Sequence, residues 1–306
     1  MTAHLEFNRF ELEYFVADVF TDTVLAGNPL AVVMNTCALT TERMQAIARE
    51  FNLSETTFVE RRAAEVERTE GVRARIFTPQ EELDFAGHPT LGTASVLKMH
   101  TPETLQGDTV KLHLNVGTVP VRFLGAGLFG EMSQRDPEFG AELDRAEVAR
   151  LTGLAVEDLD PALPPQVVST GMAFAIVVLR SGEPLAKLRV NQQEATPWLR
   201  ARGARWFYVL APELMQSPRP AQQYRARMQF YGGEDPATGS AAGCAIAYLV
   251  QRGAVASDAC IALRQGVEIG RPSDISLCAR KELTRVTDVR VGGSTVLAAT
   301  GRLFLP

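Results

Sequence analysis

Two stretches of this 306-residue sequence place an acidic residue just before a run of small residues that begins an expected helix. The first, DFAGHPTLGTASVL, starts at Asp84, and the second, DPATGSAAGCAIAYL, starts at Asp235. Proline favours the first positions of a helix, so we expect the first helix to begin at His88–Pro89. The free N–H groups and the dipole of a helix N-terminus attract anions. Each stretch therefore predicts a cradle for a substrate carboxylate, although the same small residues also suit tightly packed core helices.

Polar side chains flank these two helix starts. His88, Asp235 and Ser240 lie within them, and Ser54–Glu55 is expected on the opposite wall of a shared pocket. A carboxyl group held away from water has its pKa raised toward the range that suits proton transfer. Glu55 stands among apolar residues at an expected helix-to-strand junction, where a side chain can face a pocket. Periodicity alone does not distinguish it from a surface acid.

Two other chemistries are disfavoured. Ser240, His88 and Asp235 could form a hydrolase triad, but the local sequence TGSAAG lacks the G-x-S-x-G nucleophile elbow. The four histidines never pair at metal-ligand spacing, and a lone His88 is more often a hydrogen-bonding group than a ligand. We therefore expect no metal.

GAGLFG (125–130) matches the dinucleotide fingerprint G-x-G-x-x-G and follows the expected strand VPVRFL. That fingerprint requires a helix after the glycines, so that its N-terminus meets the pyrophosphate. The segment EMSQRDP follows instead, with Pro137 seven residues on. A turn is the better interpretation, and we predict no nicotinamide or flavin cofactor.

The chain repeats itself once. Without gaps, Asp84 aligns with Asp235 and Gly92 with Gly243. Upstream blocks keep the same order: ARIF matches ARMQF, and GNPLAVV has a weaker echo in GMAFAIVVL. One long period favours two similar domains over a solenoid, which needs at least three shorter repeats.

The elements that position these residues are mostly strands. TTERMQAIAREF (40–51) is the clearest helix, with an apolar face behind a threonine cap. Each half alternates strands with few helices, which favours an α+β fold with a sheet around a helix. We predict an N-terminal domain at 1–128, completed by a C-terminal strand at 295–305, and a second domain at 129–294.

Composition excludes several function classes. The chain is 46% hydrophobic and 22% charged with a net charge of −5, and no basic face indicates nucleic acid binding. The N-terminal residues lack the pattern of a signal peptide, and no apolar run reaches the length of a membrane span. The four cysteines lack paired short spacings, so we expect a reducing cytoplasm; they are Cys37, Cys244, Cys260 and Cys278.

From about residue 14 to its C-terminus, the chain resembles the PhzF-like family of phenazine-biosynthesis proteins. The resemblance is carried by five ordered blocks: AGNPLAVV, IAREFNLSETTFV, RIFTPQEELDFAGHPTLGTA, GEDPATGSAAG and QGVEIGRPS. It implies the fold of diaminopimelate epimerase: two similar domains related by a pseudo-two-fold axis, each a mixed sheet or open barrel around a central helix. The site would lie between them.

The resemblance also implies roles for single residues. Glu55, in NLSET, would be the acid/base that moves a proton, and His88 and Asp235 would be its supporting catalytic residues. Asn28, in AGNP, would shape the floor of the cleft or order its turn. The groups that would position the substrate are Ser54, Gly87, Gly239 and Ser240.

Related epimerases use one cysteine at each helix N-terminus, and DFAGHP and DPATGS contain none. Cys244 lies further along its helix, where packing is the expected role. One carboxylate that removes and returns a proton on a single face suits a hydrogen shift. We therefore expect a cofactor-independent isomerase of a small carboxylated, unsaturated or cyclic substrate.

Two alternatives remain open: an epimerase or racemase of an amino or hydroxy acid, and a metabolite-binding protein of the same fold. The combination of Glu55, His88 and Asp235 argues against a pure binder, since binding an anion does not require a facing carboxylate. The resemblance is compatible with a homodimer, and no nucleic acid or membrane partner is expected.

Overall fold

The computed structural model describes residues 10–213, 222–230 and 233–305. The predicted N-terminal domain starts at residue 1, and its first nine residues lie outside the described ones. By its contacts the chain divides into two compact units. The N-terminal unit comprises Met1–Leu25, Pro29–Gly130 and Thr295–Pro306, and the C-terminal unit comprises Ala26–Asn28 and Glu131–Ser294.

The N-terminal unit is a mixed sheet packed on one central helix, α3 (Gly87–His100). Residues 87–97 of this helix are all buried, against strands that include β1, β7 and β8. Neighbouring strands of the sheet are, in order, β20 (Thr295–Leu305), β1 (Phe10–Val19), β2 (Asn28–Val33), β3 (Glu55–Glu60), β4 (Val72–Phe77), β7 (Thr109–Leu114) and β8 (Gly117–Phe123). Its remaining elements are α1 (Thr41–Phe51), α2 (Ala64–Glu70), β5 (Glu82–Leu83), η1 (Pro102–Thr104) and β6 (Leu105–Gln106).

Helix α1 forms as the sequence predicts. The side chain of Thr40 accepts a hydrogen bond from the N–H of Arg43, which satisfies one of the free donors of the first turn. Met44, Ile47 and Ala48 are buried on one face. The helix ends at Phe51, and β3 begins at Glu55.

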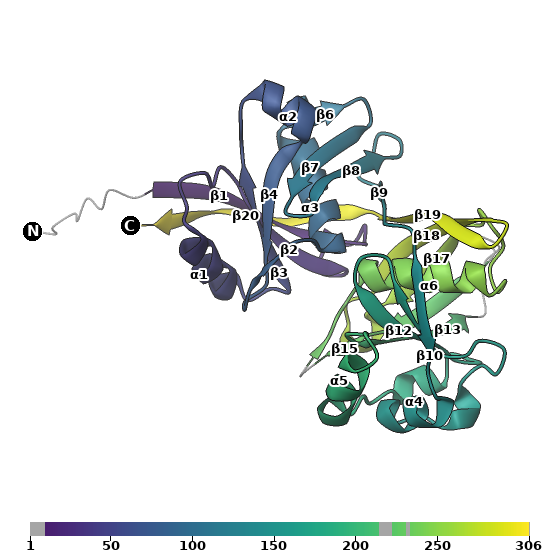
Figure 1. Cartoon of the computed structure of the whole chain (residues 1–306). Coiled ribbons are helices and arrows are strands. Elements are labelled where there is room, and N and C mark those ends of the chain that lie inside the picture. The colour runs from purple at the N-terminus through teal and green to yellow at the C-terminus, as the bar shows by residue number, and fades with distance from the viewer. Residues whose placement is uncertain (1–9, 214–221, 231–232, 306) are drawn as a thin grey trace, which may run out of the picture. The chain divides into compact units, whose positions relative to one another are not determined.

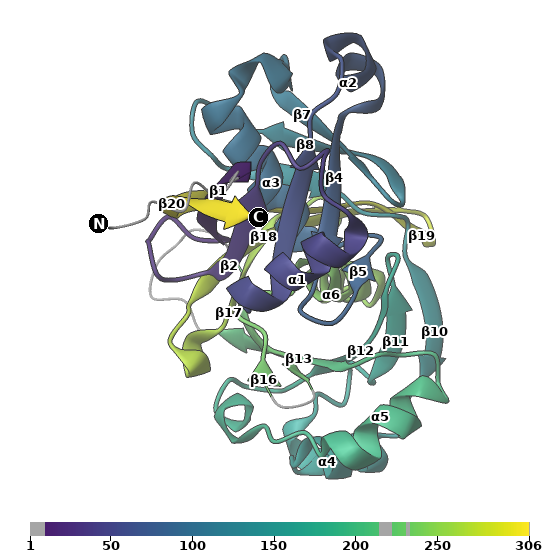
Figure 2. The ribbon, with the colours of Figure 1, turned by 90° about the vertical axis from the view of Figure 1, so that its left-hand side faces the viewer.

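The C-terminal unit has its own mixed sheet and its own central helix, α6 (Gly239–Gln251). Figures 1 and 2 show α4 (Arg145–Thr152) and α5 (Gln192–Arg200) on the face of this sheet opposite α6. Neighbouring strands are, in order, β10 (Glu138–Glu142), β11 (Gln166–Ser169), β12 (Ala173–Val178), β13 (Phe207–Glu213), β14 (Gln223–Arg227), β17 (Ile261–Gln265), β18 (Ser273–Glu282), β19 (Arg285–Gly293) and β9 (Gly130–Ser133). The remaining elements are η2 (Val156–Asp158), η3 (Pro184–Lys187), β15 (Gln229–Phe230), β16 (Gly233–Glu234) and η4 (Val267–Ile269).

The two units repeat one topology. In the N-terminal unit, β2 and β3 are parallel, β3 and β4 antiparallel, β4 and β7 parallel, and β7 and β8 antiparallel. The same alternation links β12 to β13, β14, β17 and β18. The central helices α3 and α6 occupy equivalent places in the two chains of elements. The expected α+β fold with two similar halves, each a mixed sheet around a helix, is confirmed.

The glycine-rich segment GAGLFG is a turn between β8 and β9, as the sequence predicts. The N–H of Leu124 donates to the carbonyl of Phe129 at 2.9 Å, and the next element is a strand rather than a helix. The start of α3 differs from the expectation by one residue. The helix begins at Gly87 with Ala86 as its extended N-cap, so Pro89 is its third residue.

Two of the four cysteines form a disulfide, which disagrees with the expectation of a reducing cytoplasm. Cys260 and Cys278 form a disulfide across 18 positions, with Cα atoms 4.5 Å apart. Antiparallel β17 and β18 pair Ile261 with Leu277, so the residue before one meets the residue after the other. Strand pairing rather than sequence spacing brings the two cysteines together. Disulfides are rare in a reducing cytoplasm, so the cysteines no longer support that location.

Among the described residues, no helix is long and apolar enough to cross a membrane.

Candidate active site

Glu55 and His88 lie together in the N-terminal unit. Glu55 is the first residue of β3, and His88 is the second residue of α3. Glu55 Oε2 and His88 Nε2 are 3.4 Å apart, which is within ion-pair distance but longer than a hydrogen bond of usual length. The side chains are 17% and 6% exposed, respectively, so the carboxyl group keeps some access to solvent while the imidazole is buried.

Burial lowers the pKa of His88 to about 3, because water cannot solvate the charged form of the buried ring. The imidazole is therefore neutral at physiological pH. A neutral imidazole nitrogen donates or accepts a hydrogen bond according to its tautomer. His88 can thus donate to an ionised carboxylate or accept from a carboxylic acid, and so it accommodates Glu55 in either protonation state.

The N-terminus of α3 offers fewer donors than expected. Gly87 and His88 supply N–H groups without acceptors inside the helix, but Pro89 has none. The N–H of Thr90 already donates to the carbonyl of Ala86 at 3.3 Å. The anion cradle predicted at this helix start is therefore restricted to two N–H groups. Ser54, partly exposed, immediately precedes Glu55.

Asp235 is the centre of a polar cluster in the C-terminal unit. Asn28 Nδ2 donates to Asp235 Oδ1 at 2.8 Å, and Thr238 Oγ1 donates to Asp235 Oδ2 at 2.7 Å. Asn28 Nδ2 also donates to the carbonyl of Ala237 at 2.9 Å. Asn28 therefore holds the loop that leads into α6 at two points, the carboxylate of Asp235 and the backbone of Ala237.

Gln265 and Tyr208 complete this cluster, although their sequence patterns did not predict it. Gln265 Nε2 donates to the carbonyl of Asp235 at 2.8 Å and to Thr238 Oγ1 at 2.9 Å. Its Oε1 accepts from Tyr208 Oη at 2.9 Å and from the N–H of Thr238 at 3.1 Å. Both side chains are fully buried, and burial raises the pKa of Tyr208 well above its usual range. Gln265 stands in the block QGVEIGRPS, whereas Tyr208 has only the pattern of a core strand.

The pKa of Asp235 rises to about 6, because the surrounding chain desolvates its carboxyl group. Hydrogen bonds from Thr238, from the N–H of Ala237 and from Asn28 lower the pKa and offset part of this effect. A carboxyl group with this pKa holds a proton for part of the time near neutral pH. It is therefore suited to general acid–base chemistry.

The central helix α6 starts directly behind this cluster. Gly239 is its buried first residue, Ser240 follows and is partly exposed, and Thr238 is the N-cap. Gln134 Nε2 donates to the carbonyl of Gly239 at 2.9 Å. Cys244 lies deeper in the helix and is fully buried, and burial raises its pKa to about 11. The thiol is therefore poorly suited to nucleophilic or proton-transfer chemistry.

The structure thus joins the predicted site residues into two sets. Glu55 and His88 are in contact, with Ser54 and Gly87 beside them in sequence. Asn28 and Asp235 are hydrogen-bonded in the other unit, where Gly239 and Ser240 begin the next helix. The carboxylate oxygens of Asp235 bond to Asn28 and Thr238 and not to a histidine, as a hydrolase triad would require.

The family model of the phenazine biosynthesis-like proteins, PhzC-PhzF, matches residues 17–301 of the chain. The chain belongs to this family. A curated relative, the trans-2,3-dihydro-3-hydroxyanthranilate isomerase of Pseudomonas aeruginosa, is 36% identical over 95% of this chain and 99% of its own.

Two solved structures resemble the chain over almost its whole length. A phenazine biosynthesis protein of the PhzF family from Bacillus anthracis superposes with a TM-score of 0.83 at 25% identity, covering 97% of this chain and all of its own. A predicted epimerase from Pseudomonas aeruginosa reaches a TM-score of 0.76 at 35% identity, covering 95% of this chain and 99% of its own. The expectation of an isomerase with this fold is confirmed. None of these names identifies the reacting residues.

Proposed function

We propose that this PhzF-like chain moves a proton on a small carboxylated, unsaturated or cyclic substrate without a cofactor, with Glu55 as the general acid/base. The observation that carries the proposal is the 3.4 Å contact between the partly exposed carboxyl group of Glu55 and the buried imidazole of His88. A proton-transferring carboxyl group must change its protonation state during turnover. A neutral partner that both donates and accepts supports this change better than a fixed cation does.

In the proposed reaction, Glu55 removes a proton from one carbon of the substrate. The bonding electrons spread over the conjugated system. The proton on the partly exposed carboxyl group exchanges with solvent, and Glu55 then delivers a proton to another carbon on the same face. The carboxylate is regenerated and the product is an isomer of the substrate, so atoms and charges balance. A single base suffices, in line with the absence of cysteine from DFAGHP and DPATGS.

We propose that the second set serves the same reaction by binding and polarising the substrate. Asp235, with a pKa of about 6, would exchange a proton with the substrate's polar groups. Asn28 would hold the carboxyl group of Asp235 in place. The N–H groups of Gly239 and Ser240 open α6 and would bind the substrate carboxylate. Gly87 and Ser54 would do the same beside Glu55.

The relative from Pseudomonas aeruginosa is named for a dihydro-hydroxyanthranilate, a cyclic unsaturated acid. A substrate of this class is our first candidate. The second candidate is epimerisation of an amino or hydroxy acid, which needs a base on each face of one carbon. The raised pKa of Asp235 favours this alternative, because Asp235 could serve as the second base beside Glu55.

Incubation in heavy water tests the proposal. Candidate cyclic and acyclic acids, beginning with trans-2,3-dihydro-3-hydroxyanthranilate, are followed by NMR for deuterium at carbon in the recovered product. We expect incorporation with the wild type and none with Glu55→Gln. Glu60→Gln, at the far end of the same strand, is the matched control and should behave as the wild type.

Equal exchange by Glu55→Gln and the wild type would refute the role of Glu55. Inversion at one carbon, lost in Asp235→Asn as well as in Glu55→Gln, would select epimerisation. Binding of these acids without exchange would indicate a binding protein. The homodimer is a further proposal, which sedimentation would test. The expected cytoplasmic location disagrees with the Cys260–Cys278 disulfide, and a thiol count on freshly isolated protein would decide between the two.

A further inference from the structure

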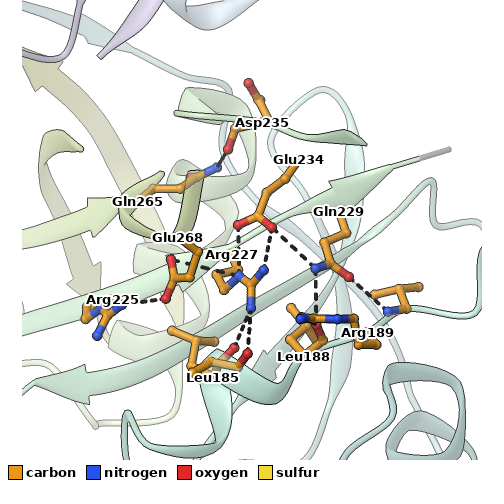
Figure 3. A network of polar contacts seen from close by, with 12 residues as sticks. Leu185, Leu188, Arg189, Arg225, Arg227, Gln229, Glu234, Asp235, Gln265 and Glu268 are labelled. Carbon is orange, nitrogen blue, oxygen red and sulfur yellow. Dashed lines mark hydrogen bonds and ion pairs between the residues drawn. The ribbon is translucent and has the colours of Figure 1, made fainter. Parts of the chain in front are cut away.

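An arginine–glutamate ion pair with two hydrogen bonds recurs at the same topological place in both units. In the N-terminal unit, Nε and Nη2 of Arg75, on β4, donate to Glu82, on β5, at 2.8 and 2.6 Å. In the C-terminal unit, Nε and Nη2 of Arg227, on β14, donate to Glu234, on β16, at the same two distances (Figure 3). Each glutamate belongs to the last strand before the central helix.

The pair in the C-terminal unit is almost wholly buried, with side chains 5% and 7% exposed. Arg227 Nη1 also donates to the carbonyls of Leu185 and Ala186, at 2.8 and 3.3 Å. Gln229 Nε2 donates to Glu234 Oε2 at 3.3 Å. A buried ion pair contributes little net stability because desolvation offsets the attraction. The main effect of the pair is therefore on the geometry of the residues around it.

That geometry concerns Asp235, which directly follows Glu234. The N–H of Asp235 donates to the carbonyl of Met228 at 3.0 Å, and Gln265 holds its carbonyl. Figure 3 shows the side chain of Glu234 directed at Arg227, while Gln265 meets Asp235 at the backbone. The ion pair thus holds Glu234, and backbone hydrogen bonds hold the N–H and the carbonyl of Asp235, the residue that carries the carboxyl group of the cluster.

The pair in the N-terminal unit is partly buried, with side chains 16% and 23% exposed. Arg75 Nη2 also donates to Thr41 Oγ1 at 2.9 Å, and Glu82 accepts from Asn115 Nδ2 at 3.1 Å. Glu82 pairs with Phe77 in the sheet. From this anchored strand the chain needs only residues 84–86 to reach α3 and His88.

We propose that the two ion pairs position the catalytic groups by fixing the strand-to-helix junctions. Arg75–Glu82 sets the imidazole of His88 against Glu55. Arg227–Glu234 sets the carboxyl group of Asp235 against Asn28 and Thr238. The catalytic consequence rests on the function proposed above, whereas the positioning is measurable without any substrate.

For the N-terminal unit, the variant is Glu82→Gln and the readout is the ¹⁵N spectrum of the imidazole of His88, assigned with His88→Gln. We expect the signals of His88 to shift as its contact with Glu55 changes. Glu67→Gln is the matched control: Glu67, on α2 of the same unit, accepts hydrogen bonds from the guanidinium group of Arg61. Unchanged signals in folded Glu82→Gln would overturn the proposal for this unit.

For the C-terminal unit, the readout is the pKa of Asp235, measured by ¹³C NMR of labelled aspartate and assigned with Asp235→Asn. The variant is Glu234→Asp, which keeps the buried charge but shortens the side chain, and which we therefore expect to fold more readily than Glu234→Gln. We expect the pKa to move by about one unit from its wild-type value. Asp274→Asn, which breaks an exposed pair with Arg264, is the control. An unmoved pKa in folded Glu234→Asp would overturn the proposal.

Turnover then separates this inference from the proposed function. On trans-2,3-dihydro-3-hydroxyanthranilate, we expect kcat to fall about tenfold in Glu82→Gln and Glu234→Asp with KM changed by less than about twofold, since misplaced groups slow chemistry. A lower kcat in Glu67→Gln as well would assign the effect to general stability and refute the positioning role. If the wild type exchanges nothing in the whole panel of acids, the proposed function fails, and the two NMR measurements still decide the positioning.

Discussion

Asn28 donates its side-chain amide to the carboxyl group of Asp235, 207 positions further along the chain, at 2.8 Å. By its contacts Asn28 belongs to the C-terminal unit, although Pro29 and the rest of β2 belong to the N-terminal one. Arg271 reinforces this assignment, because its guanidinium donates to the carbonyls of Ala26 and Gly27 at 2.7 and 2.8 Å. A three-residue segment thus completes the cluster around Asp235.

Replacing Asn28 by alanine should raise the pKa of Asp235 above about 6, since the hydrogen bond from Asn28 lowers it. The loss of this bond and of the bond to Ala237 should cost about 1 to 3 kcal/mol of unfolding free energy. Urea unfolding and ¹³C NMR of labelled aspartate measure the two effects. A lowered or unaltered pKa would show that Asn28 does not stabilise the carboxylate.

Asp235 should make stability fall as pH rises. Its pKa in the folded state, about 6, exceeds the ordinary value of 3.8, so folding favours the protonated acid. This contribution is fully present below pH 3.8 and is lost as pH rises through 6. Relative to Asp235→Asn, the wild type should lose at most about 3 kcal/mol across this window. Unfolding curves at a series of pH values measure it, and parallel profiles of the two proteins would contradict it.

His88 should have the opposite effect on acidification. Burial places its folded-state pKa at about 3, below the ordinary 6.5, so the unfolded chain binds a proton that the folded chain refuses. Stability is therefore lost as pH falls below 6.5, by up to about 1.4 kcal/mol per pH unit. His88→Gln should flatten this slope between about pH 6.5 and 4 in the same unfolding experiments. A slope that survives the substitution would assign it to other groups.

The disulfide should stabilise the C-terminal unit. A loop of the 18 positions between Cys260 and Cys278 corresponds to about 3 kcal/mol through the reduced entropy of the unfolded chain. Cys260→Ser should therefore lower the unfolding free energy by about this amount, and reductant should affect the wild type but not the variant. Exposed Cys37 should react with a thiol reagent in the folded protein, whereas buried Cys244 should not. Equal stability with and without reductant would contradict the prediction.

Substituting Gly243 should disturb the start of α6. A Cβ there would lie 1.9 Å from Gln134 Oε1, a distance that no non-bonded pair of heavy atoms tolerates. Gln134 would have to move, and it would lose its bonds to the carbonyl of Gly239 and to Thr170. We expect Gly243→Ala to cost about 1 to 3 kcal/mol in urea unfolding. Gly127→Ala, where a Cβ meets nothing within 4 Å, is the control and should be near neutral.

The sequence by itself determined what short-range patterns encode. The cap at Thr40 and the spacing of Met44 and Ile47 were sufficient for α1, because a helix is stabilised by contacts three and four residues apart. The repeated blocks around Asp84 and Asp235 were sufficient for two similar halves. For Glu55, residue patterns alone favoured a surface acid, and only the family resemblance predicted a catalytic acid.

Tertiary structure alone decided which distant residues meet. Strand pairing joins Cys260 to Cys278, and packing brings Gln265, Tyr208 and Asn28 to the loop around Asp235. Burial in that packing raises the pKa of Asp235 and lowers that of His88. Desolvation and long-range hydrogen bonds depend on the whole surrounding chain, so no local pattern carries them. The contact between Glu55 and His88 belongs to the same class, since it joins a strand and a helix 33 positions apart.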